Sequence, residues 1–574
     1  MKYLAVFLFL VSIVFAKTEK EYIQRINNHI LIEDYESALQ EAKLALKNKN
    51  SKELKAKYIY TLALNEDDLK AIQELKSLYK KDSSFLKNHD LLEGLAFEII
   101  NKGSKSMQFQ TRLTSLIGAY LTRDVNGVKV INQALKDSNA VIRSIALQLA
   151  SSYMDEPLKN EVRKLMDNEK LWLVKLEVIK AIGQMKIEDQ EKKIEDILTS
   201  DKSTYEEKSF AIKAYVNIFD SISKDKIKTL SNSGKASLRE LSCILASHFN
   251  VKEVEDIVLN LLDDPISDVR IAALNAICFS YLDTIDNKKL KEKLLIKTSD
   301  SDYKVAITAN YIAILKDFEF GKKKILEFIK KDSLEIKRMA ASAISRCINK
   351  CPNLAYEVMQ KEKDDFVKAN IAIGFIGIRE NVKASLDIIY NLLENDKQMW
   401  MIDSSKNPNF EVLSPSTIRH VDHIPNYPEA IDQMTRLNLL AMLCVLEDAR
   451  ALDAIKHFLK KESWGITGFA AATLLKEGDE KALDTVKEAM NGDDNTIKVQ
   501  SALVLALLGK DPSVIETLQN AYFTADHEMK IHILEAIAHI SSKESIEFLV
   551  KVLEEPFQIL RVIAASALIQ CING

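Results

Sequence analysis

The sequence predicts an all-α fold, a right-handed αα-superhelix in which pairs of helices stack into a curved solenoid. Three observations lead to this prediction. One motif returns along the chain, each return carries two amphipathic helical segments, and helix-breaking residues are scarce, with 15 Gly and 9 Pro in 574 residues. A chain of this length is too long for one ordinary hydrophobic core, whereas a repeat array grows simply by adding pairs.

The recurring motif is clearest at residues 263–277, DDPISDVRIAALNAI, where acidic and turn residues precede a basic residue, Arg270, and an Ala-rich helix. Basic residues recur in the same position at a nearly constant step, a regularity that is typical of helical repeat proteins. They are Arg143, Lys175, Lys208, Arg239, Arg270, Lys304, Lys337, Lys368, Arg436, Lys498, Lys530 and Arg561.

Two irregularities in the period are informative. The step from Lys368 to Arg436 is twice the usual one, so an insertion replaces one occurrence of the motif. Thr467 lies midway between Arg436 and Lys498, where the helical pattern continues without a basic residue.

Each period also contains a first helix in matching register. In the last third of the chain its apolar positions follow the same step as the basic motif, and they are Leu452, Leu483, Ile515 and Ile546. Apolar residues within these segments recur three and four apart, as in an amphipathic helix, and the second segments are more apolar, as in SALVLALL. A pair of this kind buries its apolar face only against neighbouring pairs.

The motif resembles the HEAT and HEAT-like (bilin-lyase type) repeat family. The pattern D-x-x-[apolar]-[RK]-x-x-A-A-x-A-[LI] is best kept in DVRIAALNAI, KRMAASAI and LRVIAASAL, and the resemblance covers residues 125–396 and 429–574. It implies that acidic or Ser residues cap the second helices, that Ala pairs allow close helix approach, and that the basic residues reach acceptors in the adjoining turns. We therefore interpret these basic residues as structural. The family contains scaffolds, adaptors and a few enzymes, so the resemblance does not fix a function.

Residues 17–124 are also predicted to be helical but lack the basic motif. The stretch DYESALQEAKLALKNKN spaces its small and apolar residues in a way that resembles a tetratricopeptide (TPR) helix pair: Tyr35, Ala38, Leu39, Ala42 and Leu46. A TPR-like cap and diverged HEAT-like helices remain alternatives, because both architectures need an atypical terminal repeat. NKGSKS, residues 101–106, is the best candidate for the boundary.

Residues 1–16 have the pattern of a secretory signal peptide. Lys2 precedes an apolar run from Tyr3 to Phe15, and Val14-Phe15-Ala16 predicts cleavage after Ala16. The alternative, a membrane anchor, is disfavoured because the run of about 14 residues is shorter than the roughly 20 that span a bilayer. We expect a bacterial protein that is periplasmic or secreted, with no transmembrane segment after signal removal.

Export permits disulfides, but the six cysteines do not form an evident disulfide framework, because most lie in apolar helical runs. Cys347 and Cys351 are four apart and are placed on one helix face, although a bridge within a regular helix is uncommon. Charge is nearly balanced, with 79 basic and 83 acidic side chains, so nucleic acid is not an expected partner.

The clearest departure from the repeat pattern is residues 397–428, an insertion that holds four of the nine prolines and cannot be a continuous helix. Insertions in repeat arrays lie on one loop face and often contact ligands. Its residue types suit a partner-binding site, for which the candidates are Trp400, Arg419, His420, Asp422, His423 and Tyr427. The alternative is an ordered loop that covers the neighbouring repeats.

No residue pattern indicates a cofactor, a metal site or catalysis. His420, Asp422 and His423 offer imidazole and carboxylate ligands, but their spacing specifies no metal geometry. The HEAT-like di-iron hydroxylases resemble one another in carrying several His-Glu pairs, whereas this chain has only His527-Glu528. Gly-rich phosphate loops, nucleophile elbows and Cys/His nucleophile motifs are absent from the sequence.

The sequence therefore predicts a non-catalytic exported scaffold that binds another protein or a peptide through its concave groove, through the insertion, or through both. Two alternatives remain: a HEAT-like enzyme of the lyase or glycosylase type, and an assembly or chaperone factor for cell-envelope proteins. An exposed apolar groove would favour the last of these.

Overall fold

The computed structural model describes residues 18–395, 398–403, 409–416, 427–446, 448–458, 470, 484, 486–487, 490–492 and 495–574. These residues form helices joined by short turns, with one two-stranded sheet in the insertion. The predicted all-α superhelix is confirmed. None of the helices within these ranges is both long and apolar enough to cross a bilayer. The predicted signal peptide lies outside the described residues.

The chain divides into two compact units. Unit 1 contains residues 1–178 together with 487–574, and unit 2 contains residues 179–486. Unit 2 is therefore inserted in sequence between two segments of unit 1. The divisions fall inside the repeat array, whereas the sequence suggested boundaries near residue 124 and at the insertion.

Unit 1 begins with the helix pairs that precede the basic motif and ends with the last helices of the chain. Its N-terminal elements are α2 (Glu19–Leu31), α3 (Tyr35–Asn48), α4 (Lys52–Leu64), α5 (Asp68–Tyr79), η1 (Ser83–Lys87), α6 (His89–Ser104), α7 (Phe109–Leu121), α8 (Val125–Ala134), α9 (Ala140–Ala150), α10 (Glu156–Asn168) and the start of α11 (Trp172–Gln184). Its C-terminal elements are α29 (Asn495–Gly509), η6 (Pro512–Val514), α30 (Ile515–Tyr522), α31 (His527–Ile540), η7 (Lys543–Ser545), α32 (Ile546–Val552) and α33 (Gln558–Asn573).

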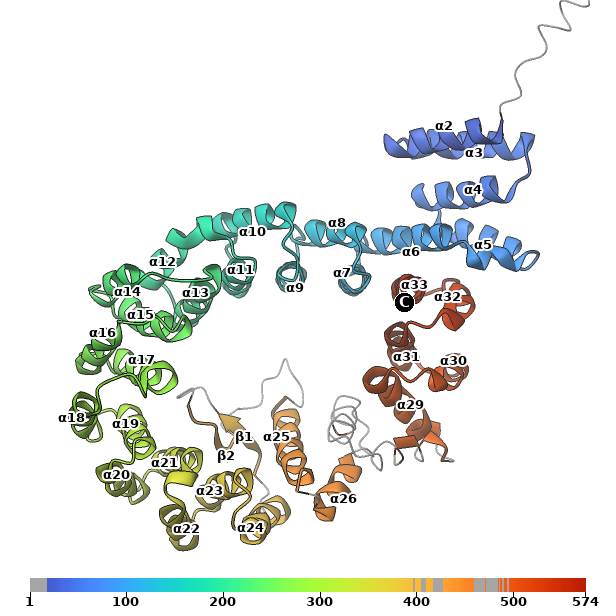
Figure 1. Cartoon of the computed structure of the whole chain (residues 1–574). Coiled ribbons are helices and arrows are strands. Elements are labelled where there is room, and N and C mark those ends of the chain that lie inside the picture. Colours follow the sequence, from blue (N-terminus) through green and yellow to red (C-terminus); the bar gives the residue numbers. More distant parts are fainter. Residues whose placement is uncertain are drawn as a thin grey trace, which may run out of the picture. The chain divides into compact units, whose positions relative to one another are not determined.

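The two segments of unit 1 join where α33 packs against α6 and α7 (Figure 1). The Ser566 hydroxyl donates a buried hydrogen bond of 3.0 Å to the carbonyl oxygen of Gly118. A Cβ atom on Gly103 would lie 2.8 Å from a methyl group of Val562, so glycine is needed for this close approach. Helices from opposite ends of the sequence thus share one core.

Unit 2 continues the array of helix pairs. Its elements are η2 (Glu188–Gln190), α12 (Glu191–Thr199), α13 (Tyr205–Ile218), α14 (Lys224–Ser231), α15 (Ala236–His248), α16 (Glu255–Asn260), η3 (Leu261–Asp263), α17 (Ser267–Ala276), the π-helical turn η4 (Ile277–Tyr281), α18 (Asn287–Lys297), α19 (Tyr303–Leu315), α20 (Glu319–Ile329), α21 (Leu334–Arg346), η5 (Ile348–Lys350), α22 (Pro352–Lys361), α23 (Asp365–Gly377), α24 (Val382–Asn395), β1 (Trp400–Asp403), β2 (Val412–Pro415), α25 (Tyr427–Cys444) and α26 (Ala449–Phe458). Within unit 2 the second helices of successive pairs, α13 to α23, follow one another along the inner side of an arc (Figure 1). This inner face is called the groove face below.

The sequence explains where many second helices begin. Asn139, Asp302 and Asp364 each precede a second helix, and their side chains accept hydrogen bonds from its first free backbone amides. The capping expected from the family resemblance is confirmed at these helices. The motif at α17 is an exception, because its N-cap is Ile266, whose side chain cannot accept a hydrogen bond.

Within the described residues, five of the twelve basic residues of the motif form ion pairs that link successive helix pairs. Arg239 donates two hydrogen bonds to Asp264, of 2.6 and 2.9 Å, and a third to the carbonyl oxygen of Ser233 in the turn before its own helix. Arg270 donates a single hydrogen bond of 2.7 Å to Asp300 and two more to the carbonyl oxygens of Asp264 and Pro265, and its Nε has no hydrogen-bond partner among the described residues. Burial raises the pKa of Asp264, but the bonds from Arg239 and from a backbone amide more than offset burial and keep the pKa below its usual value. The structural interpretation of these basic residues is confirmed at these positions.

The acceptor has a fixed place in each link, three positions before the next second helix begins. It is Asp137 before α9, Glu169 before α11, Asp264 before α17, Asp300 before α19, Glu362 before α23 and Glu555 before α33. The donor to Asp137 is Arg112, which lies N-terminal to residue 125, where the sequence resemblance begins. We call this series of links the ladder.

The ladder lacks its acid at the joint of unit 1. Arg561, on α33, donates to the carbonyl oxygens of Glu555 and Pro556, but its buried Nε has no hydrogen-bond partner among the described residues. The position three before α7 is Ser106, whose hydroxyl lies 3.4 Å from the Gln558 side chain of α33. The neutral side chain of Ser106 therefore occupies the position at which the other links of the ladder have a carboxylate.

Replacement of Ala273 tests the packing of the second helices. Ala273 is fully buried in α17, so we expect Ala273→Asp to lower the free energy of unfolding by about 3–5 kcal/mol through burial of an unpaired charge. The matched control is Ala449→Asp at the exposed start of α26, where a negative charge is tolerated. Urea denaturation measures both variants, and equal stability of the two would contradict this packing.

Replacement of Ser106 tests the effect of adding an acid at the ladder position that lacks one. We expect Ser106→Asp to raise the free energy of unfolding by about 1.5 kcal/mol, because the new carboxylate accepts a charge-assisted hydrogen bond from Arg561. Thermal unfolding should show a higher Tm for this variant, and no increase when Arg561→Gln is also present. Ser138→Asp, in a neighbouring turn, serves as the control with an expected change within about 0.5 kcal/mol.

Candidate functional site

The insertion folds back onto the groove face of unit 2. Its two strands pair antiparallel, with Trp400 opposite Pro415 and Asp403 opposite Val412. β2 contacts α21 and α23, and β1 contacts α25 (Figure 1). The groove face therefore already holds an extended segment of the chain.

Polar side chains of the second helices bind the backbone of this segment. The Asn370 amide donates to the carbonyl oxygen of Leu413 at 2.8 Å and accepts from the Leu413 amide at 3.0 Å, and all of these groups are buried. The Ser342 hydroxyl donates to the carbonyl oxygen of Glu411 at 3.0 Å. Such contacts depend on extended backbone rather than on the identity of the bound side chains.

Apolar contacts fix the same segment in place. Phe410 and Leu413 are buried in the main core of unit 2, and the Phe410 ring meets Tyr311 edge to face at 5.4 Å. Asn409, at the end of the segment, hydrogen-bonds to Asn275 of α17. The described part of the insertion is thus an integral layer of the repeat core, which agrees with the alternative of an ordered covering loop.

Trp400 belongs to this buried layer. Its side chain is 0% exposed, its ring meets Phe366 edge to face at 5.9 Å, and the Arg436 guanidinium lies 3.9 Å from the ring centre. Its backbone amide donates to Asp432 at 2.7 Å. Trp400 was predicted to contact a partner, but in this structure its ring packs the insertion against the repeats and offers no surface to solvent.

Of the other five predicted site residues, the structure describes only the backbone of Tyr427. Arg419, His420, Asp422 and His423 lie outside the described residues, and Tyr427 begins α25 without a described side chain. Their role in partner binding stays a prediction. The hairpin was not predicted from the sequence, although MWMI and FEVL flanking the turn-rich SSKNPN are a recognisable hairpin signal.

A pocket opens on the groove face next to the insertion. Its volume is about 530 Å³, and its lining comes from α13, α15, α17, η4 and α19. Asn275, which binds Asn409 of the insertion, is one of the lining residues, so the pocket adjoins the stretch of the insertion that leads into β2. Phe279 lines the pocket and is 64% exposed. This pocket was not predicted from the sequence, because its lining residues have the sequence pattern of ordinary helix positions.

Two carboxylates give the pocket its electrostatic character. Burial, together with the smaller effect of the negative charge on Asp268, raises the pKa of Glu240 to about 7. Neither carboxylate forms an ion pair in the part of the chain that the structure describes. Lys213, Lys304 and the His248 ring also line the pocket, but none of them neutralises Glu240. A cationic group entering the pocket would meet an unpaired negative site.

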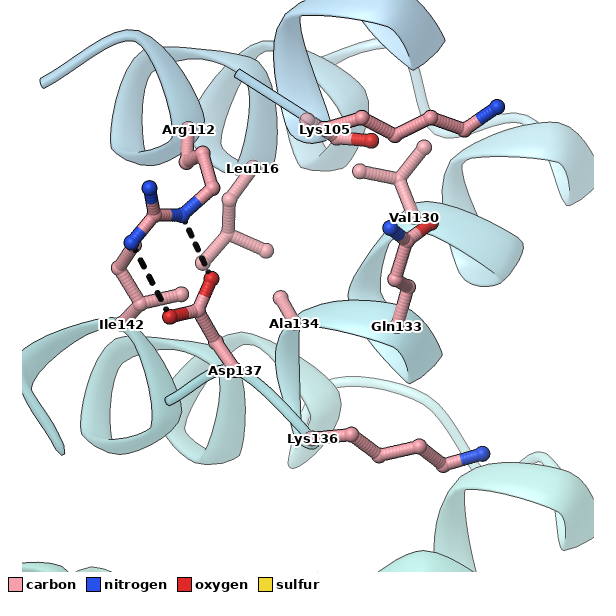
Figure 2. A pocket seen from close by; sticks show the side chains of 10 residues that line it. Lys105, Arg112, Leu116, Val130, Gln133, Ala134, Lys136, Asp137 and Ile142 are labelled. Carbon is pink, nitrogen blue, oxygen red and sulfur yellow. Dashed lines mark hydrogen bonds and ion pairs between the residues drawn. The ribbon is translucent and has the colours of Figure 1, made fainter. Parts of the chain in front are cut away.

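Another pocket, of about 350 Å³, lies in unit 1 between α6, α7, α8 and α9. Figure 2 shows that one wall is the ladder pair Arg112 and Asp137, joined by bonds of 2.7 and 3.2 Å. Lys105 and Lys136, which also line it, lie 3.8 Å from Glu66 and 3.4 Å from Glu161 respectively. The cationic side chains of this pocket already form ion pairs with carboxylates. This pocket is therefore a weaker candidate for a binding site than the groove pocket.

Within the described ranges, no group of three or more His, Cys, Asp or Glu side chains is arranged so that it could hold a metal ion. The described histidines lie on α2, α6, α15, α26 and α31.

Replacement of Asn370 tests how the groove face holds extended backbone. We expect Asn370→Asp to lower the free energy of unfolding by about 2–3 kcal/mol, because the carboxylate cannot donate to the Leu413 carbonyl and is buried. Asn287→Asp, at the exposed start of α18, is the matched control and should change stability little. Equal denaturation midpoints would show that the insertion is held by its apolar side chains alone.

No family model and no curated protein matches the chain. Solved structures with some similarity include Kap95p with RanGDP (10% identity, 93% of this chain and 85% of that chain, TM-score 0.36) and Kap121p (12%, 93% and 80%, 0.33). The myosin chaperone UNC-45 from C. elegans with an Hsp70 peptide is another (12%, 97% and 86%, 0.31). TM-scores this low carry no argument about function. The helix pairs and the ladder of this chain themselves show an all-α helical-repeat fold.

Proposed function

We propose that the chain is a non-catalytic helical-repeat scaffold that binds an extended segment of another protein in the groove pocket of α13, α15 and α17. The observation that carries this proposal is the insertion itself. The adjoining groove face holds an extended strand through its backbone, using Asn370 and Ser342, and the pocket continues from that stretch at Asn275. An extended ligand in the pocket would use the same kind of surface.

The lining of the pocket indicates which side chains the segment carries. An apolar side chain fits against Phe279, Ile244 and Ile271, and a Lys or Arg side chain neutralises Glu240 and Asp268. The gain is largest at Glu240, because an unpaired carboxylate in a desolvated position is costly until a cation meets it. The proposed ligand is therefore an extended peptide segment with a basic residue next to an apolar one.

The proposal includes export. The signal-peptide pattern of residues 1–16, with cleavage after Ala16, supports a periplasmic or secreted scaffold, whose partner is then a protein of the cell envelope or the exterior. An assembly or chaperone factor is the version of this function in which the partner is held transiently.

Deleting the insertion is not a clean test of binding, because Phe410, Leu413 and Trp400 belong to the core of unit 2. Point variants in the pocket avoid this difficulty. A displayed library of extended peptides selected on the purified full chain is expected to yield basic-apolar segments. Their affinity is expected to fall at least about 10-fold for Glu240→Gln and for Phe279→Ala, as lost charge and contact area predict.

The control is Leu295→Ala, which removes an exposed apolar side chain of α18 that does not line the pocket and should leave affinity unchanged. Selected peptides that bind all variants equally would exclude the pocket as the site. A photocrosslinker at position 279 would then locate the segment on an actual partner from the cell envelope.

The affinity should also depend on pH. Glu240 is half ionised near pH 7, so binding of a basic segment is expected to strengthen between pH 6 and pH 8 as Glu240 loses its proton. His248, Asp268, Lys213 and Lys304 line the same pocket. The pH dependence should therefore persist in His248→Gln and disappear in Glu240→Gln.

A further inference from the structure

We propose that Cys347 and Cys351 form a reversible disulfide that ties the end of α21 to the start of α22. Their sulfur atoms lie 4.0 Å apart, and both side chains are buried. A disulfide bond is about 2.05 Å long, so a shift of about 2 Å, within the reach of side-chain rotation, closes the bond. This site does not depend on the proposed binding function.

The backbone between the two cysteines is not a regular helix, so a disulfide bond between them is not a bond within one helix. Sequence spacing alone places the two cysteines on one face of a regular helix, where a bridge is uncommon. In the structure Cys347 follows the last residue of α21, a short 3-10 turn covers Ile348–Lys350, and Cys351 precedes Pro352, where α22 begins. The pair therefore spans the turn between two helices.

The two thiols have unequal reactivity. The hydrogen bond from Cys347 lowers the pKa of Cys351, burial opposes this, and the positive charge of Lys322 lowers it further. The same contact, together with burial, raises the pKa of Cys347. Cys351 is also the less buried side chain of the two, 4% exposed against 0% for Cys347. Cys351 is therefore the first nucleophile and Cys347 the resolving thiol.

The reaction needs only an external disulfide as oxidant. The Cys351 thiolate attacks one sulfur of a small disulfide RSSR, which forms a mixed disulfide and releases RS⁻. Cys347 then loses its proton and attacks the sulfur of Cys351, which forms the internal bond and releases the second RS⁻. Two protons from the protein balance the two thiols formed, and the external disulfide is reduced.

The bond would lie beside the anchor of the insertion. Ser342 and Arg346 of α21 both contact Glu411, and Arg346 is adjacent to Cys347. Fixing the end of α21 therefore fixes the residues that hold β2. A redox change at this turn acts on the stretch of groove face that the insertion covers.

Peptide mapping of the full chain tests the proposal directly. Trypsin cleaves after Arg346, Lys350 and Lys361, so it separates the two cysteines into the peptides 347–350 and 351–361. After incubation of the native protein with oxidised glutathione, acid quenching and alkylation, we expect these two peptides to be linked as the main product. Dithiothreitol should release them. Separate alkylated peptides, or Cys351 carrying glutathione while Cys347 is alkylated, would overturn the proposal.

Variants test the order of reaction. Cys347→Ala should accumulate the glutathione mixed disulfide on Cys351, and Cys351→Ala should leave Cys347 alkylated. The matched control is Cys571→Ala, which removes a buried cysteine of α33 and should leave the linked peptides unchanged. Glutathione found on Cys347 in the Cys351→Ala variant, at a rate equal to that of Cys351 in the other variant, would contradict the assigned roles.

Discussion

The ladder is the interaction on which the repeat array depends. Each arginine link joins three parts: a guanidinium group on a second helix, the carbonyl groups of the turn before that helix, and an acid in the corresponding turn of the next pair. The lysine links join only the basic side chain and the acid. Arg239 shows the complete arrangement with Ser233 and Asp264. One side chain thus sets both the geometry of its own turn and the spacing to its neighbour. Removal of one partner leaves a buried charge uncompensated, so the link specifies register as well as stability.

The period, the helix pairs and most ladder positions were predictable from the sequence, because they depend on apolar spacing and on residue types that recur. The exact contacts were less predictable. At one repeat Lys337 reaches its ladder acid through a single hydrogen bond of 3.3 Å, whereas its neighbour Arg338, outside the motif position, binds Asp364 through two. A one-position shift changes little in an apolar pattern, whereas the geometry of a guanidinium group decides which residue makes the bidentate contact.

The insertion and the candidate site could not be predicted in the same way. Trp400 has the residue type of a binding hot spot, and sequence alone does not distinguish an exposed aromatic side chain from one that packs a hairpin onto the groove face. The groove pocket depends on which faces of α13, α15 and α17 converge, and on the distance between Glu240 and Asp268. Residues from different repeats meet there, so no local motif marks the site. The interactions that matter are long-range and become visible only in three dimensions.

The packing of α33 on α6 and α7 has a consequence for how the chain folds. Unit 1 contains segments on both sides of residues 179–486, so its core is incomplete until the whole of unit 2 has left the ribosome. Repeat arrays ordinarily fold through contacts between neighbours, but this joint closes a very long loop and raises the contact order of an otherwise local topology. The faces of α6 and α7 that receive α33 are exposed throughout synthesis, which makes them the surfaces where a folding helper would be needed.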